Sequence, residues 1–201
     1  MAVVRLKRPI PADANPADEN LPLSVTRPEI LLDGSDREFR RLIHRMLIGQ
    51  ARLDAIRESI AARIGVNGTQ YTMLMSVLHL QGTAGVSIGA LADYLEVTGP
   101  HVTGVIGKLA ASGFVRKAAN PKDGRGVLVK LTPAGRKKLL QAFAFIAAVN
   151  DRLFEGVGRE EYRAVASFNA KFIRNTQATL DWIGRQSGGQ GREDRSHTDE
   201  I

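Results

Sequence analysis

The sequence predicts a mainly α-helical fold that contains one small β-hairpin. Two short amphipathic segments, 87–95 and 98–112, follow each other almost directly, and so tight a join is typical of a helix-turn-helix. Two strand-like segments, 114–118 and 127–131, come next and are joined by a loop that contains proline and glycine. Because helical periodicity continues on both sides, we expect a winged helix-turn-helix with N- and C-terminal dimerisation helices.

The outer helices are predicted from apolar residues that recur every three or four positions. The first helix spans 36–64, with Ser35 as its N-cap and Gly65 as its stop, and the second spans 69–80 with Thr69 as its cap. After the hairpin, Thr132 caps a helix that runs from 133 to about 155, and a last helix runs from about 159 to 185.

The domain organisation follows from these elements and from composition. Five of the eight prolines fall within the first 28 residues, and the last residues are rich in glycine, serine and charge. We expect a flexible basic arm at 1–34, a dimerisation helix at 35–66, a DNA-binding lobe at 67–132, C-terminal dimerisation helices at 133–185 and a disordered tail at 186–201.

Composition limits the function classes. The formal net charge of +7 favours a polyanionic partner such as nucleic acid. No apolar run is long enough to span a bilayer and no secretory signal is evident, so we expect a cytoplasmic protein without a membrane partner. The absence of cysteine excludes disulfides and thiolate metal sites within this chain.

Enzyme signatures are not evident. The sequence lacks a phosphate loop, a dinucleotide-binding glycine pattern and a nucleophile elbow, and its four histidines have no metal-ligand spacing. We therefore expect no catalytic residue, no metal and no cofactor. A small enzyme with an unrecognised site remains as an alternative.

The second helix of the helix-turn-helix carries the candidate DNA-binding residues. Its apolar positions match a packed pair of helices, so its other positions face solvent, where the helix can enter a major groove. The candidates on it are Thr98, Pro100, His101, Thr103 and Lys108. An ordinary surface role for each is the alternative.

Glycine is unusually frequent in this helix, at Gly99, Gly104 and Gly107. Because glycine costs a helix about 1 kcal/mol relative to alanine, helix propensity does not explain these residues. They either allow a close approach of DNA to the backbone or relieve crowding against the hairpin or the preceding helix.

The hairpin loop concentrates cations on a turn that projects from the core. Its candidates for DNA binding are Lys117, Lys122, Asp123 and Arg125. A guanidinium at Arg125 is suited to the negative potential of a minor groove, with Asp123 holding it in place. A solvated Asp–Arg pair that stabilises the turn is the alternative.

The region from about 69 to 132, which ends in NPKDGRGVLVKLTPAG, resembles the MarR family of transcription regulators. The family pattern of D-x-R, an apolar strand and L-T-x-x-G is matched by Asp123, Arg125, Val127, Val129, Leu131, Thr132 and Gly135. Two departures stand out: Gly124 replaces the usual second arginine, and Gly104 and Gly107 replace polar residues common in the recognition helix. Fewer base contacts and more recognition by DNA shape are expected.

The resemblance implies a homodimer that binds a pseudo-palindromic operator in double-stranded DNA, represses by occlusion, and is released by a small aromatic, anionic or acyl-thioester effector. The effector site is expected between the dimerisation helices and the DNA-binding lobe, at His44, Arg45, Tyr71, Met75 and His79. The alternative is a winged-helix protein-interaction or architectural module that binds DNA non-specifically.

Overall fold

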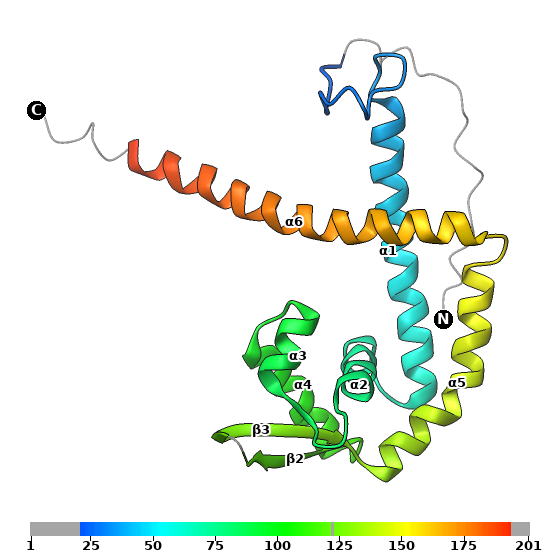
Figure 1. Cartoon of the computed structure of the whole chain (residues 1–201), viewed down its shortest axis with the longest axis vertical. Helices are drawn as coiled ribbons and strands as arrows, with labels where there is room; N and C mark the ends of the chain where they lie inside the picture. The colour runs from blue at the N-terminus through cyan, green and yellow to red at the C-terminus, as the bar shows by residue number, and fades with distance from the viewer. Residues whose placement is uncertain (1–20, 122, 194–201) are drawn as a thin grey trace, which may run out of the picture. The chain divides into compact units, whose positions relative to one another are not determined.

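The computed structural model describes residues 21–121 and 123–193. The chain divides into two compact units, Met1–Ala142 and Phe143–Ile201. The first unit contains the long helix α1 and the helix-turn-helix with its hairpin, and the second contains the end of α5 and the whole of α6 (Figure 1).

Two helices open the first unit, α1 (Arg37–Ile64) and α2 (Gly68–Leu80). Gly65 follows the last residue of α1 and stops the helix, as the sequence predicts, with a φ of 88° in the left-handed region. The predicted caps of both helices are wrong. Asp36 is the N-cap of α1, and α2 begins with a capping box in which Asn67 accepts from the Gln70 amide and Gln70 accepts from the Asn67 amide.

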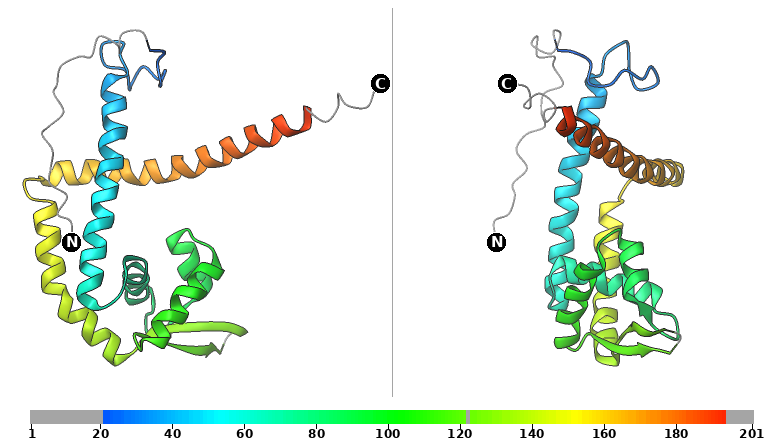
Figure 2. Two further views of the ribbon diagram at one scale, coloured as in Figure 1. Left: turned by 180° about the vertical axis from the view of Figure 1, so that it is seen from behind. Right: turned by 90° about the vertical axis from the view of Figure 1, so that its left-hand side faces the viewer.

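The helix-turn-helix consists of α3 (Ile88–Leu95) and α4 (Gly99–Ala111), close to the predicted bounds. The Ser87 hydroxyl caps α3 by accepting from the Ala90 amide at 3.1 Å. Glu96 ends α3 in the left-handed conformation (φ 53°), which turns the chain sharply enough for α4 to cross its partner. Figure 2 shows the two helices and α2 together, with the hairpin extending beyond them.

A three-stranded antiparallel sheet in the order β1-β3-β2 completes the lobe. β2 (Val115–Asn120) and β3 (Asp123–Leu131) are longer than predicted, because the strands continue into the segment 119–126, where Ala119 pairs with Val127 and Asn120 with Asp123. β1 (Val86–Ser87), which the sequence does not predict, adds a short edge by pairing Val86 with Val129. The basic loop between the strands is therefore short.

The core of the first unit lies where α2, α4 and the sheet meet. Its fully buried residues include Met73, Leu74, Val77, Leu91, Val102, Ile106, Leu109, Val129 and Leu139. Ile60, Ala61 and Ile64 are the buried residues of α1, so this helix joins the lobe through its last turns. α4 is thus fixed by one face and free on the other.

Helix α5 (Pro133–Leu153) begins in the first unit, and α6 (Arg159–Glu193) forms most of the second. On α5, Leu139 and Ile146 are buried, whereas Phe143 is exposed, as is Phe154 just beyond the end of the helix. α6 continues past its predicted end at 185 to Glu193, so the first part of the predicted disordered tail is helical. Residues 1–20 of the predicted arm and 194–201 of the tail lie outside the described residues.

None of the helices within the described residues combines the length and the hydropathy that a membrane-spanning segment needs.

Candidate nucleic-acid interface

The outward face of α4 carries the residues that the sequence singles out. Burial of Val102, Val105, Ile106 and Leu109 turns the opposite side of the helix to solvent. All five candidates on this helix lie at least partly open to solvent: Thr98, Pro100, His101, Thr103 and Lys108. Thr98 is the N-cap but its side chain makes no capping hydrogen bond, so the hydroxyl is not committed to the helix. The predicted solvent-facing side of α4 is confirmed.

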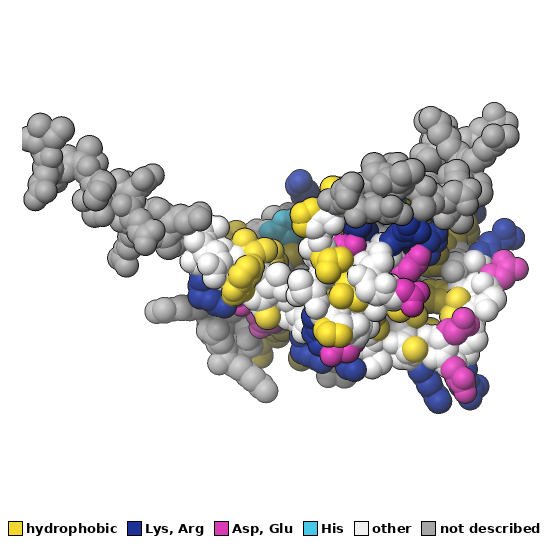
Figure 3. Space-filling view, turned by 90° about the horizontal axis from the view of Figure 1, so that it is seen from above, with side chains coloured by type: hydrophobic (Ala, Val, Ile, Leu, Met, Phe, Trp, Pro, Cys, Tyr) yellow, Lys and Arg dark blue, Asp and Glu magenta, His cyan; other side chains and the backbone are white. Residues whose placement is uncertain are grey.

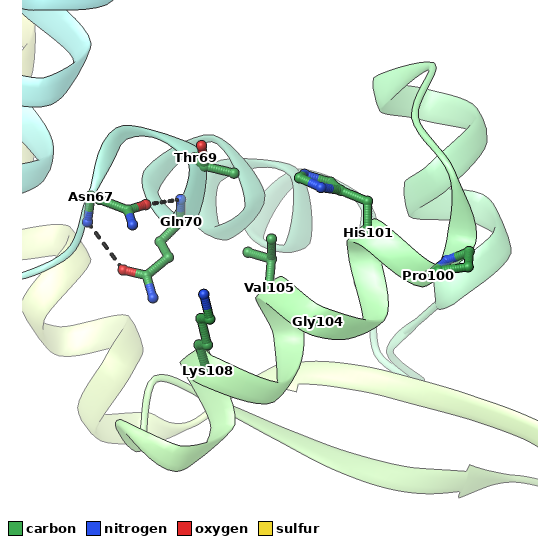
Figure 4. A pocket seen from close by; sticks show the side chains of 8 residues that line it. All are labelled: Asn67, Thr69, Gln70, Pro100, His101, Gly104, Val105 and Lys108. Atoms are coloured by element: carbon green, nitrogen blue, oxygen red, sulfur yellow. Dashed lines mark hydrogen bonds between the residues drawn. The ribbon is translucent and has the colours of Figure 1, made fainter.

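A groove of about 370 Å³ lies between α4 and the start of α2 (Figure 4). α4 lines it with Pro100, His101, Gly104, Val105 and Lys108. From α2 and its cap come Asn67, Thr69 and Gln70, which the sequence analysis does not identify as interface residues. The spacing of Asn67 and Gln70 is typical of a capping box, so the sequence can reveal that a helix starts here. It cannot reveal that this helix start packs beside α4.

The start of α2 is held in place from α1. The Gly68 amide donates to the Glu58 carboxylate at 2.9 Å, and a Cβ at Gly68 would overlap that carboxylate. The carboxylate also complements the positive end of the α2 dipole. The wall of the groove that α2 forms is therefore fixed by packing on α1.

The Lys117 side chain lies beside α4 and not at the loop of the hairpin. It lies in β2 opposite Val129, and its ammonium nitrogen is 4.0 Å from the place that a Cβ at Gly107 would occupy. The lack of a side chain at Gly107 lets this cation lie against α4. Arg116, which the sequence analysis does not select, is exposed beside it on β2.

The remaining hairpin candidates are only partly described. Lys122 lies outside the described residues. The backbone of Asp123 and Arg125 forms the start of β3, while their side chains are outside what the structure describes. Their roles in DNA binding stay predictions.

The L-T-x-x-G part of the family pattern has a structural explanation at the junction of β3 and α5. The Thr132 hydroxyl accepts from the Gly135 amide at 2.9 Å and donates to the Gly113 carbonyl at 2.6 Å. A Cβ at Gly135 would lie 2.8 Å from the Cα and carbonyl carbon of Phe114 and closer still to its oxygen. These contacts fix the base of the hairpin to α4 and α5.

The five predicted effector-site residues are not brought together within one chain. His44 and Arg45 are exposed in the first half of α1, and Arg45 precedes the buried Ile60 by roughly 22 Å of helix at about 1.5 Å per residue. Tyr71 and Met75 are half-buried on α2, and burial raises the pKa of Tyr71. The exposed His79 packs on Tyr94, with ring centroids 5.9 Å apart. Their role as ligand contacts stays a prediction.

In residues 21–121 and 123–193, no cluster of three or more His, Cys, Asp or Glu residues has the arrangement of a metal site.

Comparisons with known proteins agree with this geometry. The sequence model of the MarR family matches residues 64–126 of this chain. The transcriptional activatory protein BadR of Rhodopseudomonas palustris is 33% identical over 72 residues, which are 36% of this chain and 41% of that protein. The chain spans between 41% and 55% of the length of the curated relatives that it matches.

Solved structures extend the likeness beyond the matched segment. A MarR transcriptional regulator from Methanosarcina mazei has a TM-score of 0.57 at 21% identity, covering 69% of this chain and 99% of that one. A mutant MarR from E. coli, complexed with operator DNA, has a TM-score of 0.57 at 24% identity, covering 68% and 94%. These likenesses confirm the winged helix-turn-helix fold. The segment that matches the MarR family model, residues 64–126, contains the helix-turn-helix and most of the hairpin.

Proposed function

We propose that the chain is a DNA-binding transcription regulator that contacts a duplex through the outward face of α4 and the β2–β3 hairpin. The observation that carries the proposal is the grouping of solvent-facing polar residues on α4 with a cation from the neighbouring strand. Thr98, His101, Thr103 and Lys108 share a helix with one buried side, and the Lys117 ammonium lies against it. A helix with such a face fits the major groove.

Electrostatics and comparison support the same partner. The net charge of +7 favours a polyanion, and cations at Lys108 and Lys117 lie on the proposed face. Two structural neighbours are described as DNA complexes, that of E. coli MarR with operator DNA and that of S. aureus MepR with DNA. Two curated relatives are named as a transcriptional activatory protein and as an HTH-type transcriptional regulator.

The proposal includes a homodimer that binds a pseudo-palindromic operator. Two copies related by two-fold symmetry present two recognition helices to successive major grooves, about one helical turn apart. The exposed apolar residues of α6, among them Val165, Ile173 and Leu180, support a partner for this helix. Figure 3 shows hydrophobic side chains at the surface among charged ones.

The regulatory part of the proposal is repression by occlusion and release by a small aromatic or anionic effector. Release requires the effector to bind more tightly to a state whose recognition helices do not match the operator. The proposed effector contacts are those predicted from the sequence, His44, Arg45, Tyr71, Met75 and His79.

Selection of bound duplexes from a random DNA pool tests the function. The selected duplex should bind with at least about a 10³-fold preference over random duplex at physiological salt. Phenolic acids and their thioesters are then screened for release of that duplex. Equal affinity for selected and random duplexes, lost steeply with salt, would instead indicate a non-specific architectural module.

A further inference from the structure

Gly104 forms a notch in the outward face of α4. It lies one helical turn from both His101 and Lys108, whose exposed side chains stand on either side of it along the helix (Figure 4). All three line the groove between α4 and the start of α2. The helix backbone is therefore more accessible at Gly104 than at its neighbours on this face.

Folding does not explain the absence of a side chain at this position. A Cβ at Gly104 would have no other atom within 4 Å, and the residue has helical backbone geometry that any residue adopts. Gly135 and Gly68 differ, since a Cβ at either would overlap Phe114 or Glu58. Alanine at 104 would also favour the helix. The crowding that the sequence analysis leaves open as an explanation is thus absent at Gly104.

The chemistry at the notch is apolar. The amide and carbonyl groups of a helix interior are already paired, and the adjoining Val105 side chain, 9% exposed, lies beside the groove. A polar group of a base edge that faced Gly104 would lose its water without gaining a partner. The 5-methyl group of thymine is the apolar substituent that base pairs present in the major groove, and it loses no hydrogen bond there.

We propose that Gly104 is a specificity-determining residue whose notch accepts a thymine 5-methyl group in each half-site. The inference rests on the proposed function, because it assumes that the outward face of α4 enters a major groove. Beyond that function, the inference states that one base pair of the operator is recognised because Gly104 has no side chain. His101 and Lys108 flank the methyl group and contact the adjoining bases or phosphates.

Replacement of single thymines by deoxyuracil in the selected duplex tests the proposal, because it removes only the methyl group. With the wild-type protein, the replacement at one position of each half-site should weaken binding by about four-fold, the size expected for one buried methyl group. Gly104→Ala fills the notch with a methyl group of its own. It should bind the thymine duplex more weakly than wild type and prefer the deoxyuracil duplex at that position.

Gly49→Ala is the matched control, since Gly49 is also a helical glycine with no atom within 4 Å of its Cβ position, but on α1. Both variants should raise Tm by about 2–4 °C, which shows that the fold is intact. Gly49→Ala should keep the wild-type response to deoxyuracil.

Wild-type binding that no thymine replacement changes would overturn the inference, as would Gly104→Ala binding the thymine duplex as tightly as wild type. Both results leave the proposed function standing. A wild-type protein that shows no preference for any duplex would overturn the proposed function and this inference with it.

Discussion

Asp36 is a charged residue that is almost fully buried, at 1% exposure. Its carboxylate accepts hydrogen bonds from the amide and hydroxyl of Ser24 at 2.7 and 2.5 Å and pairs with Arg40 at 2.8 Å. The hydrogen bonds from Ser24, together with the charge of Arg40, lower the pKa of Asp36 below its ordinary value of 3.8. The carboxylate thereby ties the segment before α1 to the first turn of that helix.

The Asp36 contacts predict a pH dependence of stability. Because the pKa is lower in the folded state, the stabilisation is complete above about pH 5 and is lost as the pH falls below 3.8. Asp36→Asn should lower Tm at pH 7, and its difference from wild type should shrink below pH 3.8. A difference that stays constant from neutral to acid pH would contradict this account.

Arg125 is the second residue whose charge we expect to matter. It lies in β3 next to the short loop of the hairpin, where a guanidinium can enter a minor groove. Arg125→Ala should weaken binding of the selected duplex by about 1–3 kcal/mol with little change in Tm. Arg152→Ala, which removes the same charge from an exposed position of α5, is the control and should bind as wild type. Equal binding by both variants would remove the hairpin from the mechanism.

For single residues, the sequence predicts which side chains are exposed better than it predicts which residues lie next to each other in space. The period of α4 identifies His101, Thr103 and Lys108 as exposed because burial alternates with helical spacing. It does not show that Asn67 and Gln70 line the same groove, since that depends on how α2 packs on α4. The predicted effector site meets a similar difficulty within one chain: it groups His44 with Tyr71, although His44 lies in the first half of α1 and Tyr71 lies on α2, beyond the other end of that long helix.

The start of α5 shows how one element fixes another. Gly135 lies against the backbone of Phe114, just before β2, and Thr132 bonds to both sides of this contact. The hairpin therefore keeps a defined orientation to α4, and the Lys117 ammonium stays beside Gly107 of that helix.

Gly135→Ala should be strongly destabilising, although alanine favours helices. The added methyl group would overlap Phe114 backbone atoms, which cannot move without displacing the hairpin. A cost of about 1–3 kcal/mol or more is expected in denaturant unfolding. Gly49→Ala, with open space, should change stability in the opposite direction. A neutral Gly135→Ala would show that the junction is looser than described.

Helices with a regular apolar period are predicted well, and the strands are not. α3 and α4 match their predicted spans closely, because cap residues and apolar spacing agree. β1 is missed because two residues carry no period, and β2 and β3 extend through glycine and asparagine because pairing across the hairpin overrides propensity. α6 extends to Glu193 through residues that composition alone marks as loop.

At the scale of the whole molecule, the exposed apolar stripe of α6 supports the proposed homodimer. Its residues Tyr162, Val165, Asn169, Phe172, Thr176, Leu180 and Ile183 recur every three or four positions, and only Phe172 among them is half-buried. A continuous exposed stripe of this kind is characteristic of an interface between subunits.

Leu180→Glu should convert the proposed homodimer into a monomer or weaken it strongly, since it places a charge in the stripe, where Leu180 is 62% exposed. Ala178→Glu is the control, because Ala178 is exposed on the opposite side of the same helix. Sedimentation equilibrium distinguishes the two. A Leu180→Glu protein that remains dimeric would exclude this stripe from the interface.

The lack of cysteine permits a direct map of the bound duplex, because a single introduced cysteine is the only labelling site. His101→Cys, coupled to an iron chelate that cleaves DNA locally, places the cleaving group on the outward face of α4. The selected duplex should be cut in two clusters about one helical turn apart, one in each half-site. The same chelate at Leu47→Cys, exposed on α1, should give only background cleavage. Cleavage from position 101 no stronger than from position 47 would contradict the assignment of α4 as the DNA-contacting helix.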